Sequence, residues 1–143
     1  MSRPEEAEKA FLAGVNCAQA MLVTYGPAYG LDESLALKIG SGLGGGVGHT
    51  GDICGAVMGA CIVLGLKYGS SDKSADRKAP IDKVKEYVDR FATHCGTVDC
   101  LLLLGASIRA PEELTKARQE GLFKTRCPRY VRAAAEILED FVD

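Results

Sequence analysis

The stretch from Ile53 to Leu66, ICGAVMGACIVLGL, is a run of apolar and small residues without a charged residue. It is shorter than the ~20 residues that a membrane span needs, and it contains three glycines. We therefore interpret it as a buried core helix, extending to about Tyr68. Asp52 is suited to be its N-cap, and Gly69 is suited to end it.

The segments around this central helix also predict helices. Apolar residues recur at helical spacing from Pro4 to Tyr25, so we expect one helix there. Pro and cap residues mark the starts of further helices after Asp32, at Pro80, near Thr97, at Pro111 and at Cys127. No segment alternates as a strand would. We predict an all-α fold, a single compact domain over residues 1–143 with about five to seven helices.

The composition narrows the classes of function. The 143 residues include 17 Lys plus Arg and 19 Asp plus Glu, for a net charge of −2, which argues against a nucleic-acid binder. The first residues, MSRPEEAEKAF, are acidic and lack the apolar run of a signal peptide, so we expect a cytoplasmic protein with no membrane span. In a reducing cytosol, six cysteines suggest metal binding, redox chemistry or packing more than structural disulfides.

Three of the cysteines fall at expected helix starts. Cys54 and Cys100 follow caps, and Cys127 takes an N-cap position before a proline. Unpaired N–H groups and the positive end of the helix dipole favour a thiolate there. Basic residues flank Cys127 in the sequence KTRCPR. We therefore expect a low pKa at Cys127 and Cys54, and in thiol–disulfide chemistry one of these two would be the attacking thiol.

The other three cysteines carry weaker signals. Cys54 and Cys61 lie about 10 Å apart along one helix, too far for a disulfide or a shared metal ion. We expect Cys61 and Cys95 to be core residues, with a Cys95–Cys100 pair as the alternative. Cys17, on the apolar stripe of the first expected helix, would by itself be a structural thiol.

Four short motifs together resemble a known family. They are GVNCAQAML around Cys17, the motif Cys54-Gly55-Ala56-x-x-Gly59, TVDCLLLLG around Cys100, and RCP at Cys127. These motifs resemble those of the redox-active proteins named for the pattern C_GCAxxG_C_C, and the resemblance extends from Phe11 to about Leu138. It implies redox activity or a bound iron–sulfur-type group. It also implies that Cys17 belongs to the site and that Cys61 and Cys95 do not.

Four thiols in one site could serve several chemistries. Our first expectation is an iron–sulfur cluster for electron transfer with a partner protein. The alternatives are thiol–disulfide chemistry without a metal, a structural zinc site, and cysteines that only pack. Gly55 and Gly59 would let a cluster or a partner helix approach closely. Each chemistry requires the fold to bring Cys17, Cys54, Cys100 and Cys127 into one neighbourhood.

A glycine-rich loop, GSGLGGGVGHTG at residues 40–51, precedes the central helix. It matches G-x-G-x-x-G twice, but no strand precedes it, so a dinucleotide site is not supported. We interpret it as a tight turn, with a nest of N–H groups for an anion or cluster as the alternative. His49 in this loop is a candidate proton donor or ligand. The small residues of the central helix are compatible with a homodimer.

Overall fold

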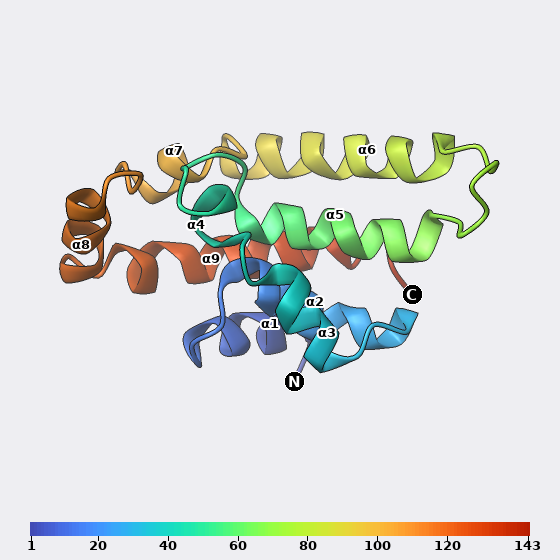
Figure 1. Ribbon diagram of the computed structural model, residues 1–143, viewed down its shortest axis with the longest axis horizontal. Helices are drawn as coiled ribbons and strands as arrows, with labels where there is room; N and C mark the ends of the chain where they lie inside the picture. Colours follow the sequence, from blue (N-terminus) through green and yellow to red (C-terminus); the bar gives the residue numbers. More distant parts are fainter.

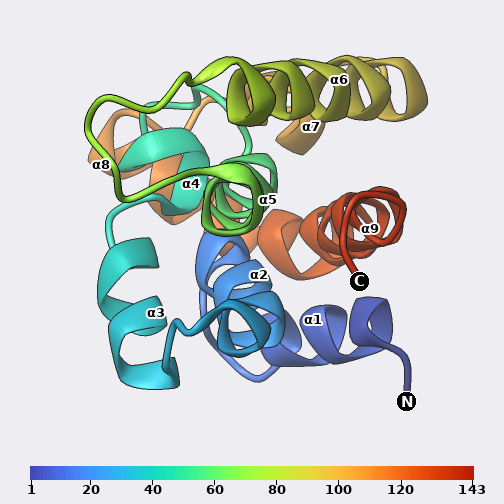
Figure 2. The same cartoon turned by 90° about the vertical axis from the view of Figure 1, so that its right-hand side faces the viewer.

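The central helix is α5 (Gly55–Tyr68), and the longer helices pack around it. The computed structural model describes all residues 1–143 (Figure 1). Figure 2 looks along α5 and shows it surrounded by α2 (Cys17–Tyr25), α6 (Lys78–Cys95) and α9 (Leu122–Leu138). The uncharged stretch that predicts a buried helix therefore forms the middle of the bundle.

The remaining elements cover the ends and one side of this group. They are α1 (Arg3–Leu12), η1 (Gly26–Tyr29), α3 (Glu33–Gly40), α4 (Gly44–Val47), α7 (Cys100–Leu104) and α8 (Pro111–Gln119). The all-α prediction is confirmed, with 69% of residues helical and no strands. There are eight helices besides the α4 turn, more than the five to seven expected.

The extra helix arises because the segment from Pro4 to Tyr25 is two helices, α1 and α2, and not one. Gly14 adopts φ +123 between them, a conformation that side chains other than hydrogen disfavour. Asn16 then caps α2. Its side chain accepts a hydrogen bond from the Gln19 N–H at 2.8 Å, and the Gln19 side chain accepts one from the Asn16 N–H at 2.9 Å. The apolar spacing continues across the break because both helices face the same core.

The predicted start of the last helix at Cys127 is also wrong. Helix α9 begins at Leu122, after Gly121 with φ +69, and continues through Pro128. Cys127 therefore lies inside a helix and has no free N–H groups beside it. Pro128 cannot donate to the Lys124 carbonyl, but residue 124 is exposed, so water can satisfy that oxygen.

Two other expected caps lie too early in the sequence. Cys54, not Asp52, is the N-cap residue of α5. Asp99, not Thr97, is the N-cap of α7, where its carboxylate accepts a hydrogen bond from the Leu101 N–H at 2.9 Å. Gly69, Gly96 and Gly105 end their helices as predicted.

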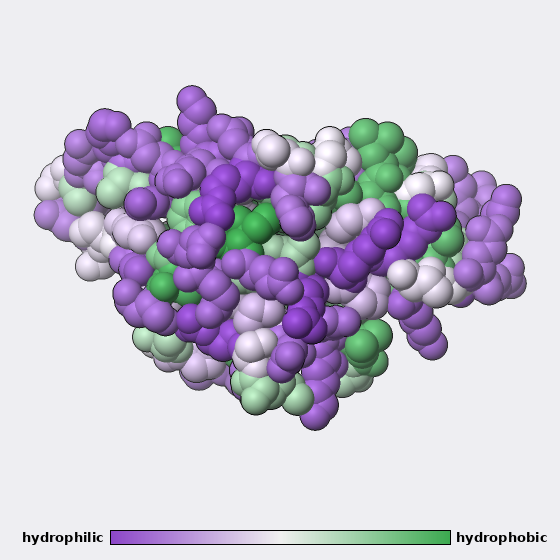
Figure 3. Space-filling view, turned by 180° about the vertical axis from the view of Figure 1, so that it is seen from behind, coloured by the Kyte–Doolittle hydropathy of each residue, from purple (hydrophilic) through white to green (hydrophobic).

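The core joins helices that are distant in the sequence. Its largest fully buried side chains include Tyr25, Tyr87 and Phe91. The Tyr87 hydroxyl donates to the Ala134 carbonyl at 2.7 Å, and every buried side-chain N or O atom has a hydrogen-bond partner. Figure 3 shows a molecular face covered mainly by hydrophilic side chains. None of the helices combines the length and hydropathy required of a membrane span.

The small residues of α5 are used inside the chain. A Cβ on Gly59 would lie 2.9 Å from the Ala18 carbonyl oxygen and from the Met21 Cβ. Helices α2 and α5 therefore approach closely through this glycine. The face that suggested a homodimer is occupied by α2, and the oligomeric state stays a prediction.

Candidate functional site

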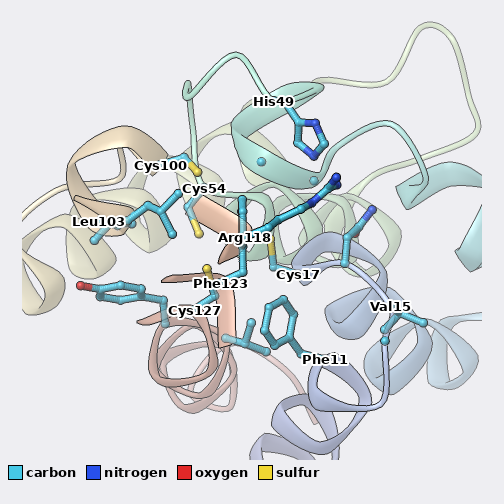
Figure 4. Close-up of a pocket in the computed structure, with 17 residues that line it drawn as sticks. Phe11, Val15, Cys17, His49, Cys54, Cys100, Leu103, Arg118, Phe123 and Cys127 are labelled. Atoms are coloured by element: carbon cyan, nitrogen blue, oxygen red, sulfur yellow. The ribbon is translucent and has the colours of Figure 1, made fainter. Parts of the chain in front are cut away.

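Cys17, Cys54, Cys100 and Cys127 line one cavity of about 200 Å³. They come from the start of α2, the cap of α5, the start of α7 and the middle of α9. Figure 4 shows their sulfur atoms directed toward the same space. The convergence that the sequence predicts is therefore present in the fold, although no cysteine is in a disulfide.

Cys17 and Cys54 meet where α2 packs on α5. A Cβ on Gly55 would lie 2.6 Å from the Cys17 Sγ, so only glycine leaves room for this sulfur. Gly55 directly follows Cys54 in the chain, and the same packing that admits the Cys17 sulfur brings the two thiols into hydrogen-bonding range. The structure thus gives Gly55 a role in holding a sulfur at the start of α5.

A short antiparallel pairing places Cys100 diagonally across from Cys54. The Cys54 N–H donates to the Val98 carbonyl at 2.7 Å, and the Cys100 N–H donates to the Asp52 carbonyl at 2.7 Å. Ile53 and Asp99 form an isolated β-bridge between these two bonds. The two backbone segments before α5 and α7 are therefore fixed side by side.

The glycine-rich loop forms a tight cover over this pairing. Gly45 and Gly46 adopt positive φ angles of 65 and 68, and a Cβ on Gly46 would lie 2.5 Å from the Cys100 Cβ. His49 also has a positive φ of 60, which is uncommon for a residue with a side chain. Its ring packs over Gly45 and lines the cavity. The loop therefore serves as the expected turn and also borders the site.

Cys17 is the cavity thiol whose pKa is lowered. A hydrogen bond from the Cys54 thiol lowers the pKa of Cys17 to about 7, against burial, which raises it. The backbone N–H groups of Cys17 itself, Gly45 and Ala18 also contribute to this lowered value. The start of α2 and the glycine-rich loop thus supply N–H donors to one sulfur, as expected for a stabilised thiolate.

The other three cavity thiols have raised pKa values, which contradicts the low pKa predicted for Cys54 and Cys127. Burial raises the pKa of Cys127 to about 12 and that of Cys100 to about 12, and the nearby Cys17 charge contributes to both shifts. The hydrogen bond to Cys17 and burial raise the pKa of Cys54 well above its ordinary value. Cys127 has no helix start beside it to oppose burial. The basic neighbour Arg129 contacts the Tyr130 ring instead.

Cys61 and Cys95 do not line the cavity. Both are partly buried and pack against the main core, and burial raises the pKa of Cys61 to about 11. Cys95, at the end of α6, and Cys100, at the start of α7, are both free thiols. The alternative Cys95–Cys100 pair is therefore not formed. The positions of Cys61 and Cys95 agree with the expectation that both are core thiols outside the site.

Comparison with known families agrees with this grouping. Residues 15–141 match a family model described as "Putative redox-active protein (C_GCAxxG_C_C)". The chain belongs to this family. No curated protein and no solved structure matches it. Membership of the C_GCAxxG_C_C family associates the chain with cysteine redox chemistry but leaves the reaction open.

Sequence reasoning missed other residues that matter at this site. The capping-box spacing of Asn16 and Gln19 was a readable signal that a helix starts at Cys17. Arg118, from α8, lines the cavity without any local sequence signal. Gly59, expected near a cofactor in this C_GCAxxG_C_C protein, lies outside the cavity and serves the α2–α5 contact instead.

Gly55→Ala and Gly59→Ala form a matched pair that separates the site from the packing. Both add a Cβ against α2, so we expect each to lower the free energy of unfolding by about 1–3 kcal/mol. Only Gly55→Ala collides with the Cys17 sulfur and should raise the Cys17 pKa. Denaturant unfolding and the pH dependence of Cys17 alkylation measure the two effects. An equal change in the pH dependence of Cys17 alkylation in both variants would contradict the assignment of Gly55, and not Gly59, to the Cys17 site.

The cavity residues of this C_GCAxxG_C_C protein do not form a ready ligand set in this conformation. No group of three or more His, Cys, Asp or Glu side chains is arranged to hold a metal ion. Cys17 and Cys54 are the two cavity thiols whose pKa values are coupled most directly, since each is the main cause of the other's shift.

Proposed function

We propose that the protein is a dithiol–disulfide redox protein in which Cys17 is the nucleophile and Cys54 is the resolving thiol. The observations that carry the proposal are the position of the Cys17 sulfur against Gly55, directly after Cys54, and the opposite shifts of the two thiols, with the pKa of Cys17 lowered to about 7 and that of Cys54 raised. An attacking thiol is most effective when its pKa lies near the ambient pH. The neutral partner keeps its proton until the second step.

The reaction transfers two electrons to a substrate disulfide. The Cys17 thiolate attacks one substrate sulfur, a Cys17–substrate disulfide forms, the substrate S–S bond breaks, and one substrate thiolate leaves. Cys54 then gives its proton to that thiolate, and its sulfur attacks the Cys17 sulfur. The Cys17–Cys54 disulfide forms and the second substrate sulfur leaves as a thiolate.

Peptide mapping tests the product. Reduced protein is treated with excess bis(2-hydroxyethyl) disulfide, the remaining thiols are blocked, and the digest is examined by mass spectrometry. We expect one internal disulfide, between Cys17 and Cys54, and the same disulfide in Cys61→Ala. An internal disulfide between any other two cysteines, or none while Cys17 is intact, would overturn the proposal.

An iron–sulfur cluster is the second candidate, since four cysteines line one cavity. Cys thiolates are the usual ligands of such clusters. In the conformation described, the thiols would have to rearrange, because no three ligand side chains are placed to hold a metal ion. Iron and acid-labile sulfide in anaerobically prepared protein would favour the cluster. Their absence after anaerobic reconstitution would favour the dithiol.

A further inference from the structure

The cavity above Cys17 has features that select a substrate. Its volume of about 200 Å³ is below the ~300–1,000 Å³ of typical ligand pockets. Aromatic and aliphatic side chains form most of its wall, among them Phe11, Leu103 and Phe123. Because Cys17 is partly buried and lines this cavity, a substrate sulfur must enter it to be attacked. A slender aliphatic molecule fits this route better than a folded protein does.

Apart from the Cys17 thiolate, the charge that lines the cavity is positive. Arg118 lines it, and neither Asp nor Glu does. Figure 4 shows the Arg118 side chain extending across the cavity in the direction of His49. The guanidinium makes no ion pair or side-chain hydrogen bond in the structure, whereas Lys116 on the same helix lies 4.0 Å from Glu120. Arg118 is thus free to bind an anion, and guanidinium groups bind carboxylates well.

We propose that the cavity accepts a small aliphatic disulfide with an acidic group, whose disulfide reaches Cys17 and whose carboxylate pairs with Arg118. The inference rests on the proposed dithiol function and adds the substrate class to it. The electron transfer is the one written above, with the acidic disulfide as the oxidant. The apolar wall contacts the methylene groups between sulfur and carboxylate. The His49 ring can donate a hydrogen bond from the same wall.

Three small disulfides of different charge test the substrate class. Dithiodipropionate is an anion, bis(2-hydroxyethyl) disulfide is neutral, and cystamine is a cation. The rate of the first thiol release is measured in a single turnover with each, for the wild type and for Arg118→Gln. The ratio of the two rates cancels the intrinsic reactivity of each disulfide. We expect Arg118→Gln to lower the rate of the first thiol release from the anionic disulfide roughly 5-fold or more, since a charge-assisted hydrogen bond is lost.

The rate with the neutral disulfide should change less than about 2-fold in Arg118→Gln, because this disulfide has no charge to pair with residue 118. Lys116→Gln is the matched control, since it removes the same charge from the same helix outside the cavity. It should leave all three rates within about 2-fold, as expected for a distant, screened charge.

The outcomes separate this inference from the proposed function. If all three disulfides oxidise the Cys17–Cys54 pair and Arg118→Gln acts on none selectively, the substrate class is wrong and the dithiol function stands. An equal effect of Lys116→Gln would also overturn the role of Arg118. If a protein disulfide reacts faster than the anion, the substrate is not small. If no disulfide oxidises the pair, the proposed function itself fails.

Discussion

Alkylation of Cys17 is expected to have its half-maximal rate near pH 7, well below the ordinary thiol value of 9.0. At that pH the Cys127 thiol, whose pKa burial raises to about 12, is almost fully protonated. The nucleophilicity of a thiolate falls as its pKa falls. The ratio of the two thiolate fractions therefore overstates the ratio of the two alkylation rates. We still expect Cys17 to react roughly 100-fold faster than Cys127. Iodoacetamide labelling followed by peptide mass spectrometry measures both rates across pH.

Two variants at Cys54 test the cause of this shift. Cys54→Ala removes the thiol that donates to Cys17, so the midpoint should move to higher pH. Cys54→Ser keeps an O–H donor and should hold the midpoint closer to that of the wild type. A wild-type midpoint above pH 8.5 would contradict the assignment of Cys17, and identical profiles for the two variants would contradict the role of Cys54.

Cys54→Ala is also expected to stop the reaction with a disulfide after its first step. Cys17 should still attack, but the resolving thiol is missing, so a mixed disulfide with the substrate should accumulate. We expect release of the second thiol to slow roughly 100-fold, because Cys54 is the side-chain partner of the Cys17 sulfur and neither Cys100 nor Cys127 is. Intact-protein mass spectrometry detects the adduct directly.

Cys61→Ala is the control for this experiment. It removes a thiol from the same helix outside the cavity, and both steps should proceed as in the wild type. Release of the second thiol at an unchanged rate in Cys54→Ala would show that another cysteine resolves the intermediate. Double variants with Cys100→Ala or Cys127→Ala would then identify that cysteine, and the assignment of Cys54 would be wrong.

The sequence by itself determined the fold class and the set of site cysteines. The uncharged run before Leu66 could only be a buried helix in a chain with so few strand signals, and glycine and proline marked most helix ends. The family motifs selected Cys17, Cys54, Cys100 and Cys127. Local signals were enough here because helix formation and capping depend on residues within a few positions of each other.

Only the tertiary structure decided which of these thiols has a lowered pKa. The expected helix starts predicted a low pKa for Cys127 and Cys54. Helix α9 begins earlier, at Leu122, so Cys127 is not at a helix start, and the Cys54 thiol donates its hydrogen bond to Cys17. A pKa depends on every donor, charge and apolar surface around the sulfur, whatever its position in the chain. For Cys17 these include Gly45 from the glycine-rich loop, and Arg118 joins the same cavity from α8. No local pattern brings these residues together.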